Sequence, residues 1–198
     1  MDENELQILV GEYYNSRFNI IRADRVRLEG VLNFRIVDED KVVEIIKSAV
    51  DNASTKIGAT IQKVILVLPS LGFKRFPLRV KIEPHNHQVS KREVAKAVSS
   101  SLNTQIDDDL VIVNSSIVKY YVNGVAARRL PEKDNCDELI VDIDLLCADK
   151  DLCYSYVAAV SKAGLKVQDI TLNNYSICRE AVLFEQSLVS NVVLYSSI

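Results

Sequence analysis

The feature that most constrains the fold is a run of five apolar residues, Val64 to Leu68, closed by Pro69. No polar residue alternates with the apolar ones, so neither face of the strand is expected to meet water. A strand of this kind lies in the centre of a sheet, with neighbouring strands on both sides. The run therefore predicts a sheet to which other parts of the chain contribute strands.

Three strand-like runs precede this segment. Leu6–Tyr14 and Arg17–Val26 are rich in apolar and aromatic residues, and only Asn15 and Ser16 separate them, which predicts a hairpin. Leu28–Val37 is predicted to be a third strand.

A helix is predicted between the third strand and the apolar run. Asp38 is a suitable N-cap, and Gly58 is a plausible stop. The residues between them that recur at helical spacing are Val42, Ile46, Ala49, Val50, Ala53 and Ile57.

The middle of the chain has its own pattern. Phe73–Ile82 alternates charged and apolar residues, and Ser90 with Glu93 forms a capping box that opens a helix. Leu110–Val122 is a long strand pattern that ends at the turn pair Asn123-Gly124, and Leu139–Leu145 alternates as a one-sided strand.

The end of the chain returns to an α/β pattern. A helical stripe over Leu152–Ala163 ends at Gly164, and Lys166–Leu172 follows as a strand. A further helix with Ile177 to Leu188 on its apolar face and a last strand, Val192–Tyr195, are predicted. The whole order predicts an α/β (α+β) chain in which residues 1–69 and 166–198 form one sheet domain and residues 70–165 form an insert.

Composition excludes several classes of protein. The net charge of −3 and the pI of about 5.5 argue against a general nucleic-acid-binding protein. No apolar run approaches the roughly 18 residues of a membrane span, and the acidic start is unlike a signal peptide. The four cysteines form no Cys-x-x-Cys pair, which favours buried thiols in a reducing compartment over a zinc site; they are Cys136, Cys147, Cys153 and Cys178.

No pattern predicts a catalytic or metal site. His85 and His87 lie close together without a third ligand, and the acidic run at 107–109 lacks the remainder of a calcium loop. Asp142 and Asp144 share one face of a strand, where solvent contact is a simpler explanation than acid-base catalysis. The serine pairs and runs lack the Gly-x-Ser-x-Gly context of a nucleophile.

Basic residues are the most asymmetric feature of the predicted insert. They could form a positive face that binds an acidic partner or a second copy, or they could be an ordinary charged edge that prevents aggregation. The residues are Lys74, Arg75, Arg79, Lys81, Lys91, Arg92, Arg128 and Arg129.

The order and spacing of several segments resemble the actin-like cell-division protein family of FtsA. The resemblance covers nearly the whole chain, with no single diagnostic motif. Its segments are Ile8–Glu12, Phe18–Ile21, Gly30–Asn33, Ile61–Pro69, Ser90–Val98 and Ala158–Val167. It implies a partial actin-like, ribonuclease H-like subdomain with the FtsA-type insert over residues 70–165.

The resemblance also implies a divisome adaptor without catalytic residues in this chain. The family's first Asp-x-Gly nucleotide loop would lie upstream of Gln7, and the second would fall at 195–198, which reads Tyr-Ser-Ser-Ile. ATP and magnesium are therefore expected only of a longer parent chain, and no cofactor or metal of residues 1–198.

The partners that the resemblance implies are an FtsZ-like ring protein, other division proteins and further copies of the chain, with no nucleic acid. The location is cytoplasmic, at the inner face of the membrane at the division site, and any membrane contact would be indirect or through a C-terminal helix absent here. A PilM-like scaffold of a pilus or secretion machine, and an actin-like ATPase in a longer parent, are the alternatives.

Overall fold

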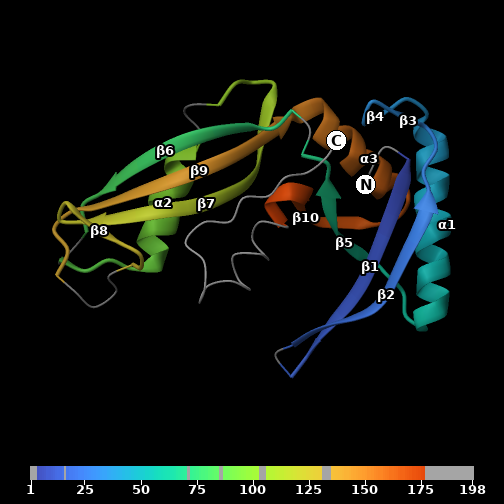
Figure 1. Cartoon of the computed structure of the whole chain (residues 1–198), viewed down its shortest axis with the longest axis horizontal. Coiled ribbons are helices and arrows are strands. Elements are labelled where there is room, and N and C mark those ends of the chain that lie inside the picture. The colour runs from blue at the N-terminus through green and yellow to red at the C-terminus, as the bar shows by residue number, and fades with distance from the viewer. Residues whose placement is uncertain are drawn as a thin grey trace. The chain divides into compact units, whose positions relative to one another are not determined.

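The computed structural model describes residues 4–15, 17–70, 72–84, 87–102, 106–130 and 135–176. These residues fall into two compact units (Figure 1). The first unit contains the described residues up to 70 and those from 151 to 176, and the second contains 72–150. Both units combine strands with helices, which confirms the mixed α/β fold class.

A long antiparallel hairpin opens the first unit. Strand β1 (Glu5–Tyr14) pairs with β2 (Arg17–Arg27) from Glu5 opposite Arg27 to Tyr14 opposite Arg17, with one register shift between Val10 and Gly11. Asn15 has a φ of 50°, a left-handed conformation that asparagine tolerates better than most residues. The predicted hairpin is confirmed.

The third predicted strand, Leu28–Val37, is wrong. The segment folds into a very short hairpin of β3 (Val31–Leu32) and β4 (Arg35–Ile36). Asn33 and Phe34 both have positive φ, at 49° and 60°, and this reverses the chain in two residues. Phenylalanine rarely adopts that conformation, so the sequence does not predict the turn.

Helix α1 (Glu39–Ile57) begins and ends where its capping residues predict. The Asp38 side chain accepts a hydrogen bond from the Lys41 backbone N–H at 3.1 Å, and Gly58 ends the helix in a left-handed conformation with φ of 69°. The helix packs against β1 and β2. Its buried residues are the predicted Val42, Ile46, Ala49, Val50 and Ala53.

A parallel pair of strands completes the sheet structure of the first unit. Strand β5 (Lys63–Leu68) pairs with β10 (Lys166–Leu172), with one register shift after Val167. The described residues show the pairing of β5 with β10, and the second neighbour expected of a central strand stays a prediction. The β1–β2 and β5–β10 pairs are separate two-stranded sheets of one unit (Figure 1).

Helix α3 (Lys150–Lys162) belongs with the first unit from Asp151 onward. The Tyr156 ring is completely buried, and its hydroxyl donates a hydrogen bond to the Phe34 carbonyl at 2.9 Å. Lys162 pairs with Glu39 at the start of α1. The second unit therefore ends at residue 150, whereas the sequence placed the end of the insert at 165.

The second unit is a four-stranded antiparallel sheet with one helix. The strands are β6 (Lys74–Ile82), β7 (Leu110–Val122), β8 (Val125–Ala127) and β9 (Leu139–Asp149), in the order β6-β9-β7-β8. Val122 faces Val125 across the turn of Asn123 and Gly124, both at positive φ. This is the two-residue hairpin that the Asn-Gly pair predicts.

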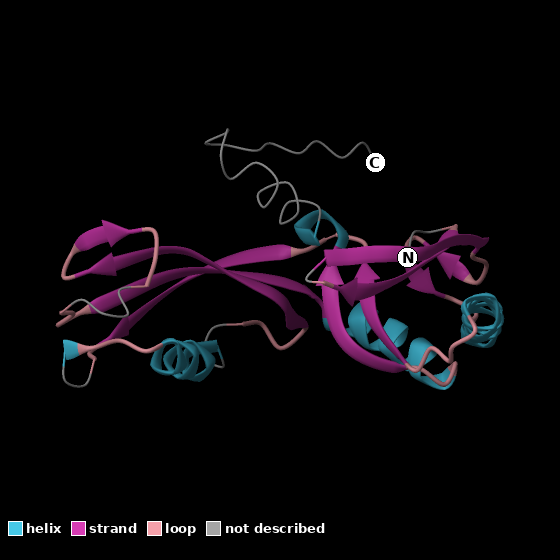
Figure 2. Cartoon of the chain, turned by 90° about the horizontal axis from the view of Figure 1, so that it is seen from below, coloured by secondary structure: helices cyan, strands magenta, loops and turns pink. Residues whose placement is uncertain are grey.

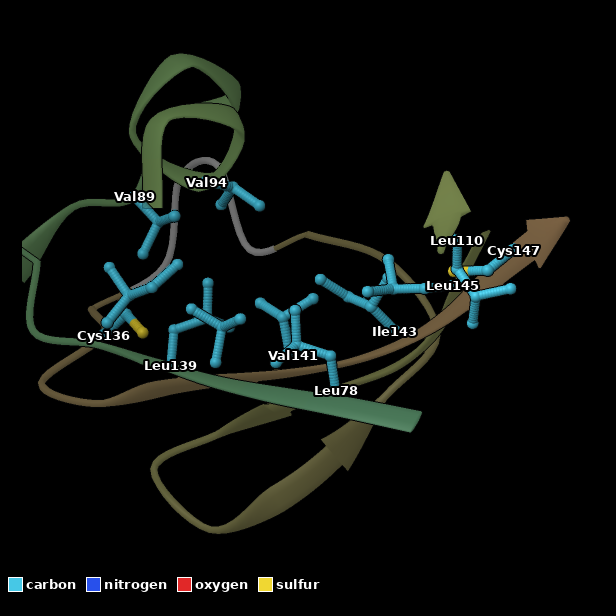
Figure 3. Close-up of a cluster of buried hydrophobic side chains, with 12 residues drawn as sticks. Leu78, Val89, Val94, Leu110, Cys136, Leu139, Val141, Ile143, Leu145 and Cys147 are labelled. Carbon is cyan, nitrogen blue, oxygen red and sulfur yellow. The ribbon is translucent and has the colours of Figure 1, made fainter. Parts of the chain in front are cut away.

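Helix α2 (Lys91–Ser101) covers one face of this sheet (Figures 2 and 3). Ser90 and Glu93 form the predicted capping box, with the Glu93 N–H donating to the Ser90 hydroxyl at 3.2 Å. Val89, just before the cap, and Val94, in the first turn, are both buried in the core beneath the helix. Alternate residues of β9 from Leu139 to Cys147 supply the floor of that core.

The predicted elements at Ile177–Leu188 and Val192–Tyr195 lie outside the described residues. Within the part of the chain that the structure describes, no helix has the length and apolar character needed to span a bilayer.

Gly30 provides a stability test of the first unit. Its φ is 88°, and an added Cβ would lie 2.7 Å from the Asp38 carbonyl oxygen. We expect Gly30→Ala to lower the free energy of unfolding by more than about 2 kcal/mol, because steric conflict adds to left-handed strain.

Gly58→Ala is the matched control, since Gly58 also has positive φ but no atom within 4 Å of an added Cβ. Its cost should stay near the roughly 1–2 kcal/mol of left-handed strain alone. Urea unfolding of both variants checks the difference, and equal losses would show that the close approach to Asp38 is absent.

Candidate protein-binding surface

The candidate surface is the face of the second unit's sheet that lies opposite α2, called here the outer face. On β6, Leu78, Val80 and Ile82 are buried in the core under α2, whereas the residues that alternate with them are exposed. Strand geometry therefore places Arg75, Pro77, Arg79 and Lys81 together on the outer face.

Each of the three cations that β6 contributes to this face has an acidic partner on or beside β9. Arg79 makes a two-pronged pair with Asp142, at 2.6 Å from Nε and 2.8 Å from Nη2. Arg75 Nη2 lies 2.8 Å from Asp144, and Lys81 Nζ lies 2.6 Å from Glu138. The cations that cluster in the sequence are thus neutralised locally in the fold.

Two residues of β7 lie near the Arg79–Asp142 pair. Lys119 stands opposite Asp142 in the ladder, and its Nζ lies 5.3 Å from the centroid of the Tyr121 ring. The Arg79 guanidinium lies 5.5 Å from the same centroid, so the ring has two cations near it. The hydrogen bond from Arg79 holds the pKa of Asp142 below its usual value, and hydrogen bonding from Tyr121 acts in the same direction.

The pairs on this face lie partly in solvent. The side chains of Asp142 and Asp144 keep 24% and 21% of their surface exposed, and those of Arg79 and Arg75 keep 64% and 61%. Exposed pairs contribute little to stability, but a two-pronged arginine–carboxylate pair fixes the orientation of both side chains. The face is therefore an ordered array of charges that a partner protein can contact.

The other predicted site residues lie elsewhere. Lys91 and Arg92 are exposed on α2, which covers the opposite face of the sheet. Arg128 and Arg129 follow β8, at the far end of the strand order from β6. Lys74, at the start of β6, pairs with Asp107 at 3.4 Å. The eight basic residues do not form one continuous patch, because strand order and the two faces separate them.

The remaining sequence candidates have structural surroundings of their own. His87 Nδ1 pairs with Asp137, while His85 and Asn86 lie outside the described residues. The described residues contain no group of three or more side chains that could hold a metal ion. Cys136, Cys147 and Cys153 are buried free thiols, and burial raises the pKa of the first two, which makes them poor nucleophiles.

Lys119, Tyr121 and Glu138 are surface residues that the sequence reasoning missed. The alternation of β9 already placed Asp142 and Asp144 on one face. The missing information was the register between β9 and β7, which two bulges shift, so Lys119 rather than Val118 stands opposite Asp142.

Sequence comparison with known proteins finds the same division protein, FtsA, from several bacteria. FtsA from Bacillus subtilis is 24% identical over 168 residues, and FtsA from Enterococcus hirae is 25% identical over 169 residues. Each match covers 84% of this chain. This chain is similar in sequence to FtsA. FtsA from Streptococcus pneumoniae is also similar, with 23% identity over 86% of the chain. The chain corresponds to 38% of the length of each of these FtsA relatives.

Comparison of structures shows the fold. A chain of a PilM-PilN type IV pilus biogenesis complex matches with a TM-score of 0.57, over 92% of this chain and 48% of its own length. The identity is 10%, so this match informs the fold and nothing finer. It supports a partial actin-like fold, as the FtsA similarity does. No protein-family model matches the chain.

The Arg79–Asp142 pair predicts how the pKa of Asp142 changes when its partner is replaced. Because the folded pKa of Asp142 is lowered, the pair stabilises the fold above the ordinary aspartate pKa, and this contribution disappears as pH falls through the lowered value. Arg79→Gln should therefore raise the pKa of Asp142. NMR titration of the carboxyl carbon checks this, with Arg92→Gln on α2 as the control. An unchanged Asp142 pKa in Arg79→Gln would contradict the pairing.

Proposed function

We propose that this chain acts in bacterial cell division as an FtsA-like adaptor that contacts other division proteins and further copies of itself. The observation that supports this most is the agreement of the FtsA relatives over 84% or more of the chain. The location that follows is the cytoplasmic side of the membrane at the division site. An FtsZ-like ring protein is the proposed principal partner.

The outer face of the second unit is the proposed contact surface. It presents fixed and alternating charges from β6 and β9, together with the Tyr121 ring. Since the cations are neutralised by their neighbours, long-range attraction of an acidic partner is weaker than the basic residues alone suggest. Recognition would instead depend on the polarity and position of each pair at short range.

A PilM-like scaffold is the second candidate function, because the match to the pilus biogenesis complex covers nearly the whole chain. The name of that complex includes PilN, which gives this alternative a definite partner to test. Binding to the PilN-type protein of the same organism, without binding to its ring protein, would favour the scaffold.

The surface proposal is tested by reversing one ion pair. The double variant Arg79→Asp with Asp142→Arg keeps both charges, the net charge and the pairing, but inverts their direction on the outer face. We expect binding to polymers of the ring protein to fall roughly tenfold or more, while the melting temperature changes little. Co-sedimentation and thermal unfolding measure the two effects.

Arg92→Glu on α2 is the control for this experiment, since α2 covers the opposite face of the sheet. Equal binding of the wild type and the inverted pair would contradict the surface proposal. Absence of any wild-type binding to the ring protein would contradict the adaptor function itself.

The chain is also expected not to bind nucleotide. Phosphate loops need closely spaced glycines and an acidic residue for magnesium, but the six glycines, at 11, 30, 58, 72, 124 and 164, are widely separated. Titration calorimetry with Mg-ATP should give no dissociation constant lower than the millimolar range. A micromolar dissociation constant would overturn this expectation.

A further inference from the structure

The outer face of the second unit carries opposite charges in two adjacent stripes. The cationic stripe on β6 is Arg75, Arg79 and Lys81, which alternate with the buried residues of that strand. The acidic stripe on β9 is Asp142 and Asp144, which also alternate with buried residues. Paired strands lie about 4.8 Å apart, so a partner that binds both stripes must present the opposite signs at this spacing.

The Arg79–Asp142 pair in these stripes can make further hydrogen bonds. A guanidinium has five N–H donors and a carboxylate has about four acceptor sites, and the pairing of Arg79 with Asp142 uses two of each. A second arginine–carboxylate pair that lies over this one with its charges exchanged can therefore add charge-assisted hydrogen bonds between the two pairs.

A second copy of this chain has the exchanged arrangement when a two-fold axis runs parallel to the strands, midway between β6 and β9. This axis places β6 of each copy over β9 of the other and keeps the position along the strands. Because Arg79 stands opposite Asp142 in the β6–β9 ladder, Arg79 of each copy then lies over Asp142 of the other. A two-fold axis across the strands would instead place like charges over each other.

We propose that the outer face binds the outer face of a second copy about this axis. The contact uses the same surface of both copies, so it joins two copies and does not extend into a filament. Aligned sheets pack about 10 Å apart, a distance that charged side chains from both faces can fill. The inference rests on the proposed function, because it takes the outer face as the contact surface.

The charge balance of the face allows two copies to approach. Each of the three cations of β6 already has an acidic partner, so little repulsion between the two faces remains. The overlap is only the width of β6 and β9, and the side chains are polar. We therefore expect a weak contact, with a dissociation constant between roughly 1 µM and 1 mM.

The test uses the full chain and the variant that combines Arg79→Asp with Asp142→Arg. When both copies carry the exchange, each cation of the pair again lies over a carboxylate. When only one copy carries it, cation lies over cation and carboxylate over carboxylate. We expect the dissociation constants of the two like mixtures to agree within about threefold, and that of the unlike mixture to be roughly tenfold higher or more.

NMR titration measures these constants, with a low concentration of one isotope-labelled protein and increasing amounts of the other, unlabelled, protein. The matched control exchanges a cross-strand pair of the first unit, as Arg25→Glu with Glu5→Arg. This control should bind the wild type as tightly as the wild type binds itself. Exchange of Arg75 with Asp144 repeats the test at a second position if the first variant does not fold.

Three results would overturn the proposal. Equal binding in like and unlike mixtures would show that self-association uses another surface. Loss of binding between two copies of the exchanged variant would show that the stripes meet a different surface of the second copy. Absence of wild-type self-association at about 1 mM would show that the contact does not form. The ring protein is absent from every mixture, so none of these results depends on whether the chain binds it.

Discussion

Backbone pairing along β5 is the constraint on which the first unit depends. Leu66 and Leu68, on one face of this strand, are buried at 5% and 0% exposure. On the other face, Ile65 and Val67 are 62% and 37% exposed. The hairpin, the parallel pair and the two helices belong to one compact unit.

The second unit differs from the first in how the two faces of its sheet are covered. Its sheet buries one face under α2 and leaves the other in solvent, which antiparallel sheets tolerate well. The solvated face carries cross-strand ion pairs between β6 and the residues on or beside β9. Those same pairs orient Arg79 and Asp142, so the side chains of the proposed contact surface have defined positions.

Local sequence signals predicted the helices and most strands well. Asp38, Ser90 and Gly58 act through hydrogen bonds and backbone conformations within one turn, so they can be recognised in the sequence. The turn at Phe34 could not be predicted, because a distant residue, Tyr156, binds its carbonyl. The same long-range packing places α3 in the first unit and moved the boundary from 165 to 150.

The candidate surface was only partly predictable for a related reason. Alternation along β6 identifies Arg75, Arg79 and Lys81 as neighbours on one face. Whether such cations attract or repel depends on strand order and register, which place Asp142 opposite Arg79. That information is not contained in any single segment.

Native-state hydrogen exchange of the unmodified chain tests the account of the first unit most directly. In β9, which has neighbours on both sides, all interior amides should exchange slowly. In β5, the amides that point toward β10 should also exchange slowly, because the parallel ladder supplies their acceptors. Rapid exchange of every amide along Val64–Leu68 would contradict the account, because it would show that β5 does not pair with β10.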